Sequence, residues 1–101
     1  MSTNLSDQIA LINKNLQNTE NHTDKLQSRI LSLYDEIDQA KTTGNEIDER
    51  RLRDELTIQL DILRQNESNK TILFEDRKRL NEQLEKDLDH LMDEGNVIAN
   101  L

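Results

Sequence analysis

The stretch LSDQIALINKNLQNTENHTDKLQSRILSLYDEIDQAKTTGNEI, residues 5–47, carries apolar residues at alternating steps of four and three. The positions on this spacing are Leu5, Ile9, Ile12, Leu16, Thr19, Thr23, Leu26, Ile30, Leu33, Ile37, Ala40, Gly44 and Ile47. Most of them are aliphatic, and nearly everything between them is polar or charged. Such spacing is typical of a long helix with one narrow apolar stripe. One helix cannot bury that stripe by itself, so the pattern predicts that another helix lies along it.

The composition favours extended helices over a compact globular core. Only 33% of the 101 residues are hydrophobic, whereas an ordinary globular domain has about 45–50% apolar residues. Charged residues make up 34%, aromatic residues 2%, and proline is absent. Disorder is the competing interpretation of so polar a chain, but regular spacing argues against it. We therefore expect a single coiled-coil or helical-bundle domain over residues 1–101.

The tetrapeptide TTGN, residues 42–45, is the best candidate for a break in the first helix. Threonine forms helices poorly, and glycine costs roughly 1 kcal/mol inside a helix but suits the position just after its end. Asn45 can then cap a second helix with its side-chain oxygen. The sequence thus predicts a helix over about residues 4–42, a turn at 42–45 and a chain that folds back near Gly44.

The register of the apolar stripes supports this turn. Continuing the first stripe past the break would place Arg51 and Asp54 in a core, which is unfavourable for charged side chains. The next apolar stripe begins at Leu52 and Leu56 and is out of phase with the first. A turn resolves the mismatch more simply than a continuous helix. A straight homodimeric rod without a turn is the alternative.

A second helix is expected over about residues 46–94. Its weak point is the polar stretch 65–70, which could form another turn or continue as a polar part of the helix. Gly95 resembles a helix end, and a short apolar tail follows at 96–101. Acid–base pairs four residues apart would support the exposed face of this helix. These pairs are Glu46–Arg50, Glu49–Arg53, Glu75–Arg79 and Glu82–Lys86.

The large aliphatic residues on the two stripes are the candidate helix-packing interface. They are Leu5, Ile9, Ile12, Leu16, Leu26, Ile30, Leu33, Ile37, Leu52, Leu56, Leu60, Leu63, Leu73, Leu80, Leu84, Leu88 and Leu91. In the second half of the chain the apolar face is wider than a single seam, and such a face usually contacts more than one helix. The predicted fold is therefore all-α, with long amphipathic coiled-coil helices in a hairpin that packs within a multi-helix assembly.

The net charge of −8 argues against two classes of partner. An acidic chain repels the phosphates of nucleic acids and of anionic membranes. No apolar run approaches the roughly 20 residues needed to span a bilayer. We therefore expect no nucleic-acid partner and no membrane insertion.

Catalytic and metal-binding patterns are missing from the sequence. There is no cysteine for a thiolate zinc site or a nucleophile. The acidic stretch at residues 85–94 includes His90, but it lacks the spacing of a calcium loop, and the other histidine, His22, is distant in sequence. We expect no catalytic residue, no metal, no cofactor and no small-molecule substrate, so the chain is not expected to be an enzyme.

The most favoured function is structural. We expect a small subunit that joins other helical chains, either copies of itself or different proteins, into a scaffold, tether or cytoskeletal complex. The alternative is a regulatory helical module: an adaptor, an inhibitor, or the N-terminal three-helix domain of a larger protein such as a vesicle-fusion protein. Residues 1–7 lack the pattern of a signal peptide, so the cytoplasm is the expected location, with the nucleus as a second choice.

Overall fold

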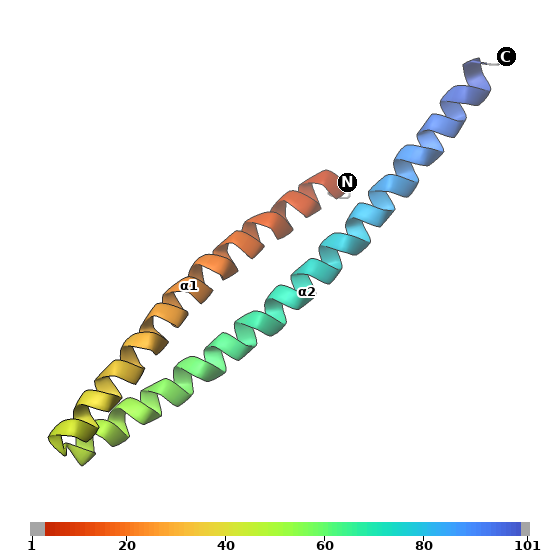
Figure 1. Ribbon diagram of the computed structural model, residues 1–101. Coiled ribbons are helices and arrows are strands. Elements are labelled where there is room, and N and C mark those ends of the chain that lie inside the picture. The colour runs from red at the N-terminus through yellow and green to blue at the C-terminus, as the bar shows by residue number, and fades with distance from the viewer. Residues whose placement is uncertain (1–3, 100–101) are drawn as a thin grey trace. The chain divides into compact units, whose positions relative to one another are not determined.

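The computed structural model describes residues 4–99, and the side chains of residues 4–92. In this part of the chain two helices, α1 (Leu5–Thr43) and α2 (Glu46–Ala99), are joined by a turn of two residues (Figure 1). The fold is all-α, and the two long helices pack as a helical hairpin, which confirms the predicted fold class and the turn near Gly44.

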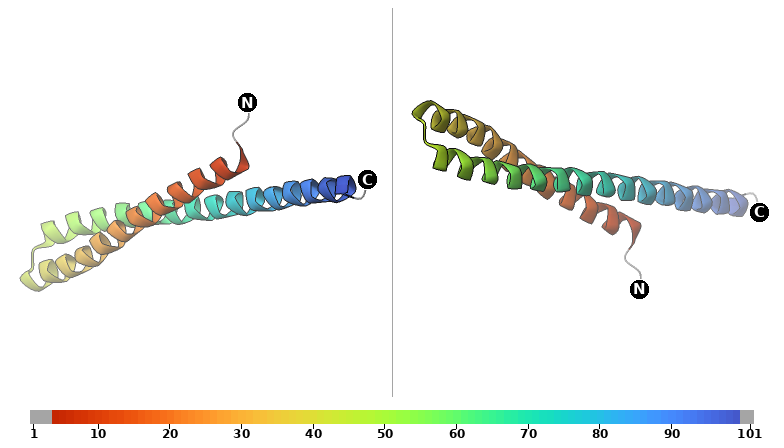
Figure 2. Two further views of the ribbon diagram at one scale, coloured as in Figure 1. Left: turned by 90° about the horizontal axis from the view of Figure 1, so that it is seen from above. Right: turned by 90° about the horizontal axis from the view of Figure 1, so that it is seen from below.

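The chain divides into two compact units, and each is described by itself. The turn unit is Gln17–Lys70, which holds the turn and the adjoining parts of both helices. The terminal unit is Met1–Leu16 together with Thr71–Leu101. Within the turn unit α1 and α2 lie side by side and run antiparallel, as both views in Figure 2 show.

Helix α1 ends at Thr43 because Gly44 follows in the left-handed conformation, with φ of +72°. The N–H of Gly44 donates to the carbonyl of Lys41 (3.1 Å), and the N–H of Asn45 donates to the carbonyl of Ala40 (2.9 Å). These two bonds are those of a Schellman motif, which satisfies carbonyls that have no partner within the helix. Glycine adopts a positive φ without steric cost, so this residue suits the turn.

Helix α2 begins with Asn45 as its cap. The Oδ1 atom of Asn45 accepts a hydrogen bond from the N–H of Asp48 (3.2 Å), and its carbonyl accepts one from the N–H of Glu49 (3.0 Å). Asn45 thus helps to end α1 and to begin α2. At the start of α1, Asn4 plays the same capping role for the N–H of Asp7 (3.1 Å).

The observed end of α2 differs from the sequence expectation, and the polar stretch 65–70 takes the helical one of its two expected forms. The helix continues through 65–70 without a break, because polar side chains of this stretch contact α1. It also continues past Gly95 to Ala99, since one glycine costs only about 1 kcal/mol within a helix and no proline follows. Of the tail predicted at 96–101, residues 96–99 are helical, and the last two lie outside the described residues.

Candidate helix-packing interface

The best-buried part of the molecule lies in the turn unit. Leu33 has no exposed surface, and Ile37, Ala40 and Leu52 are 4–7% exposed. These four residues form one cluster, against which Leu56 of α2 packs. Because the turn sets α1 against α2 at this point, the last turns of α1 bury their stripe against the first turns of α2.

Burial along the candidate interface falls toward the C-terminal part of α2. The buried members are Leu16, Leu26, Ile30, Leu33, Ile37 and Leu52. The half-buried members are Leu5, Ile9, Ile12, Leu56, Leu60, Leu63, Leu73, Leu80 and Leu84. The exposed members are Leu88 and Leu91. Ile47, which the spacing of the first stripe included, is 83% exposed, because the stripe of α1 stops at the turn and Ile47 belongs to α2.

The seam of α2 includes polar residues that the search for apolar stripes missed. Alternating steps of four and three from Leu52 lead to half-buried positions as far as Leu84. The polar residues on this spacing are Gln59, Asn66, Lys70 and Arg77. Counting the spacing without regard to residue type would have found them.

Three of these polar residues contact α1 directly. In the turn unit, Asn66 Nδ2 lies 3.0 Å from His22 Nδ1, and Lys70 Nζ lies 3.9 Å from a carboxylate oxygen of Glu20. In the terminal unit, the guanidinium of Arg77 donates to Oδ1 of Asn13 (2.9 Å) and also stacks 4.9 Å from the ring centre of Phe74. Polar contacts as well as apolar packing therefore hold α1 against α2 in each unit. Polar seam positions favour one register over others.

A cross-helix ion pair lies beside the buried cluster of the turn unit. The guanidinium of Arg29 donates to both carboxylate oxygens of Glu55, with Nε–Oε1 at 2.9 Å and Nη2–Oε2 at 3.0 Å. It also contacts Glu36 of its own helix at 3.3 Å. The hydrogen bond to Glu55 raises the pKa of Arg29, partial desolvation opposes the rise, and the charge of Glu36 adds to it. Since the pKa of Arg29 is raised, the stabilisation that comes from its charge is present at neutral pH and is lost at strongly alkaline pH, as the guanidinium deprotonates.

Replacing Arg29 by methionine and Glu55 by glutamine, singly and together, should give a favourable coupling in a double-mutant cycle. Two parallel hydrogen bonds fix the geometry of this pair, but both side chains are partly exposed, so salt should weaken the coupling. Urea unfolding followed by circular dichroism, at low and high NaCl, measures it. The more exposed pair Arg64–Asp61 is the control and should show less coupling. Equal coupling in both pairs would contradict the expectation that two parallel hydrogen bonds make the Arg29–Glu55 pair the stronger one.

Thr23 leaves a polar atom unsatisfied within the turn unit. The residue is 6% exposed, and its Oγ1 atom has no hydrogen-bond partner among the described residues. Burial of a hydroxyl group without a partner is unfavourable. Thr23 therefore weakens the seam at this layer.

The substitution Thr23→Val should raise the free energy of unfolding by about 1 kcal/mol, because it removes the unpaired hydroxyl and keeps the side-chain shape. Valine and threonine have similar helix propensities, so the gain would come from burial. Thermal unfolding measures the change. Thr57→Val is the control: Thr57 is exposed and its hydroxyl donates to the carbonyl of Arg53, so no such gain is expected there. A destabilised Thr23→Val variant would disprove this interpretation.

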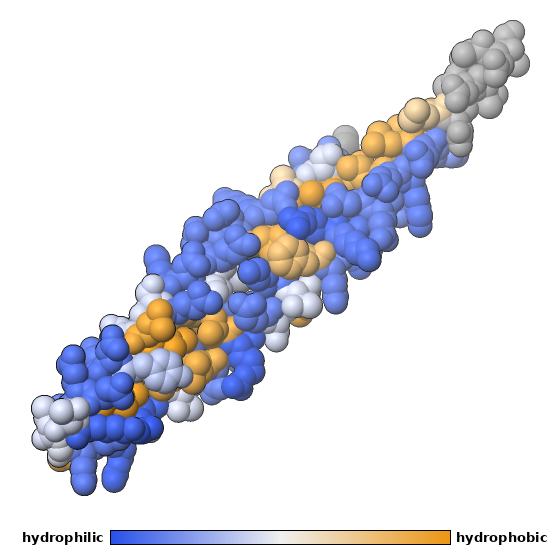
Figure 3. Space-filling model, viewed as in Figure 1, coloured by the Kyte–Doolittle hydropathy of each residue, from blue (hydrophilic) through white to orange (hydrophobic). Residues whose placement is uncertain are grey.

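Large apolar side chains also lie exposed outside the seam. In the turn unit these are Leu31 (68% exposed), Tyr34 (49%), Ile47 (83%) and Ile58 (58%). In the terminal unit they include Leu11, Ile72 and Phe74. Figure 3 shows apolar patches interrupting the otherwise hydrophilic surface. Exposed apolar residues at this density indicate surfaces for binding other chains.

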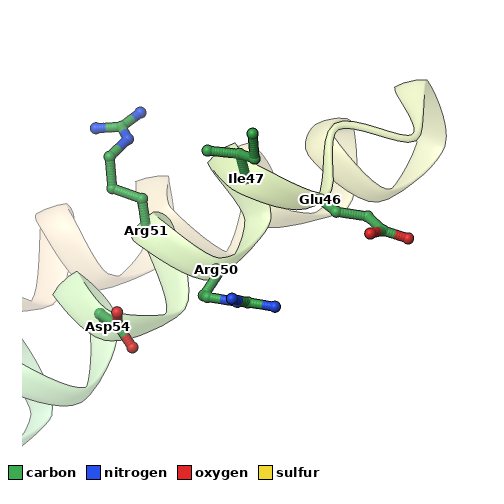
Figure 4. A pocket seen from close by; sticks show the side chains of 5 residues that line it. All are labelled: Glu46, Ile47, Arg50, Arg51 and Asp54. Carbon is green, nitrogen blue, oxygen red and sulfur yellow. The ribbon is translucent and has the colours of Figure 1, made fainter.

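The described part of the chain has shallow, open hollows on its surface. One is lined by Glu46, Ile47, Arg50, Arg51 and Asp54, all on α2 and all exposed, and their side chains diverge in Figure 4. Within the described residues, no group of three or more histidine, cysteine or acidic residues could hold a metal ion. In the same part of the chain, neither helix has a stretch both long and apolar enough to cross a membrane.

The fold and the interface together define an α-helical hairpin with unpaired apolar surface. Comparison with protein-family models, with curated proteins and with solved structures finds no match.

Proposed function

We propose that this chain is a non-enzymatic assembly protein that joins other helical chains into a scaffold, tether or cytoskeletal complex. The observation that supports this most directly is the set of exposed apolar side chains outside the seam. Leu31, Tyr34 and Ile58 of the turn unit are all about half exposed or more, although α1 and α2 already bury the seam between them. A second layer of helices would cover them.

The size of these patches indicates what kind of partner is needed. Full burial of a large apolar side chain contributes about 1.5–3 kcal/mol, so covering the exposed parts of Leu31, Tyr34 and Ile58 contributes roughly 3–5 kcal/mol. Association costs about 4–15 kcal/mol in lost freedom of motion. These three side chains alone are therefore insufficient for stable binding. A partner helix that contacts several patches along the hairpin fits better than a small ligand.

We place this role in the cytoplasm. A chain without cysteine does not depend on an oxidising compartment for its fold. Fluorescence microscopy of a tagged chain tests the location. Signal confined to a secretory organelle would contradict it.

The test of the function is the mass of the complexes that contain the chain. A tagged full chain is purified from the cells that make it, and its complexes are measured by native mass spectrometry. We expect species well above the 11.8 kDa of one chain, with a fixed stoichiometry. The free monomer alone would contradict the proposal, and transient, substoichiometric partners would favour a regulatory module.

Matched variants connect this measurement to the surface. The double variant Leu31→Ser and Ile58→Ser should reduce the fraction of chain in complexes, because both residues are exposed and apolar. The control, Gln39→Ser with Thr57→Ser, changes exposed polar residues and should leave the complexes intact. Equal behaviour of the two double variants would mean that Leu31 and Ile58 do not contribute to an interface.

A further inference from the structure

The C-terminal part of α2 extends beyond the residues of α1 that could cover it. In the terminal unit, a shared hollow is lined by Asn4 and Leu5 at the start of α1 and by Leu84 and Asp87 of α2. The described part of α1 begins at Leu5 and runs antiparallel to α2, so described residues of α1 do not lie opposite α2 after Asp87. The helix nevertheless continues to Ala99.

An apolar stripe follows this uncovered stretch. At about 100° per residue, four apolar residues fall within one stripe of the helix surface about 100° wide. This docking stripe consists of Leu84, Leu88, Leu91 and Met92. Leu84 is half-buried, while Leu88, Leu91 and Met92 are 52%, 61% and 67% exposed. Figure 3 shows apolar atoms exposed along this part of α2.

Acidic residues border the docking stripe on both sides. The same helical geometry places Asp87 on one side, and Glu85 and Asp89 on the other. All three are exposed. The basic residue of this segment, Lys86, falls on the opposite face of the helix. The stripe is therefore apolar along its centre and negatively charged along both edges.

We infer that the docking stripe binds a basic amphipathic helix of another protein, an inference that depends on the proposed assembly function. Such a helix buries its apolar face on the stripe and brings lysine or arginine side chains to the acidic edges. A second copy of this chain fits less well, because its stripe carries the same acidic edges and the whole chain has a net charge of −8. An anionic membrane is repelled for the same reason.

The probe is a synthetic helical peptide about 20 residues long, with leucine at the spacing of the stripe and lysine at the flanking positions. A second peptide has the same leucines and glutamate in place of lysine. Fluorescence anisotropy measures the binding of each labelled peptide to the full chain. We expect the lysine peptide to bind at least about tenfold more tightly than the glutamate peptide. We also expect its binding to weaken as NaCl rises from about 0.1 to 1 M, where screening shortens from about 10 to 3 Å.

Variants of the chain locate the binding. Leu88→Ser combined with Leu91→Ser should weaken binding of the lysine peptide by about tenfold or more. The control, Gln39→Ser with Thr57→Ser, changes exposed polar side chains of the turn unit and should leave binding unchanged. Circular dichroism of both double variants checks that helicity is retained. Asp87→Asn should mainly reduce the salt dependence.

Three outcomes would overturn the inference: equal binding of the two peptides, binding that survives the loss of Leu88 and Leu91, or dimers of the chain crosslinked through the stripe. These failures are distinct from failure of the proposed function. A chain that forms stoichiometric complexes in cells but does not bind the lysine peptide would retain its assembly role without this docking site. The opposite result is also possible: the chain binds the lysine peptide through the docking stripe but is monomeric in cells. That result would support the docking site and contradict the assembly role.

Discussion

The substitution Leu33→Ala should lower the free energy of unfolding by roughly 2–5 kcal/mol, the largest effect expected from a single change in this chain. Leu33 has no exposed surface and belongs to the cluster that includes Ile37 and Leu52. Alanine leaves a cavity that the surrounding side chains fill only in part. Because alanine favours helix formation, the loss would come from packing and not from the helix itself. Urea unfolding followed by circular dichroism measures it.

Leu31→Ala is the matched control. Leu31 is two residues away on the same helix and is 68% exposed, so the same atoms are removed from solvent-facing surface. The expected change in the free energy of unfolding is within about 0.5 kcal/mol. Similar losses for Leu31→Ala and Leu33→Ala would mean that α1 does not present the predicted face to α2.

The substitution Gly44→Ala should lower the free energy of unfolding by about 1–2 kcal/mol. A Cβ atom at Gly44 would have no other atom within 4 Å, so no clash contributes. The cost would arise from the φ of +72°, a conformation that residues with a side chain adopt only with strain. Thermal unfolding of the full chain measures the change.

Two further substitutions separate this backbone effect from other causes. Gly44→Asn should cost less than Gly44→Ala, because asparagine enters the left-handed region more readily. Gly95→Ala should act in the opposite direction and stabilise by about 1 kcal/mol, because Gly95 lies inside α2. A destabilising effect of the same size at both glycines would contradict the role assigned to the turn.

The all-α fold and its turn could be predicted because both depend on local patterns. The spacing from Leu5 to Ala40 fixed one face of α1, and glycine followed by asparagine fitted the requirements for ending one helix and capping the next. The same reasoning failed for Ile47, because a residue on a regular spacing is buried only while its helix continues in the same direction. Position on a stripe is necessary for burial but is not sufficient.

Contacts between helices were harder to predict from the sequence. The pairing of Arg29 with Glu55 depends on the register of the hairpin, which the two-residue turn sets. The pair Glu49–Arg53 forms within α2 as its spacing predicted, whereas Arg79 pairs with Asp76 instead of Glu75. Several acids lie within reach of one flexible guanidinium, so spacing alone does not select its partner. The sequence also did not reveal that 65–70 continues the seam with polar residues.

The shared cap at Asn45 has a consequence for the order of folding. Pairs close to the reversal, such as Arg29 and Glu55, are 26 residues apart in the chain, and His22 and Asn66 are 44 apart. Closing the shorter loop costs less chain entropy, so contacts near the turn should form first. Contacts farther along the two helices should then form one after another. The turn then sets the register of α1 against α2. A shift of register would break the hydrogen bonds that end α1 and those that cap α2. A partner chain that binds after folding would contact two helices whose register is already set.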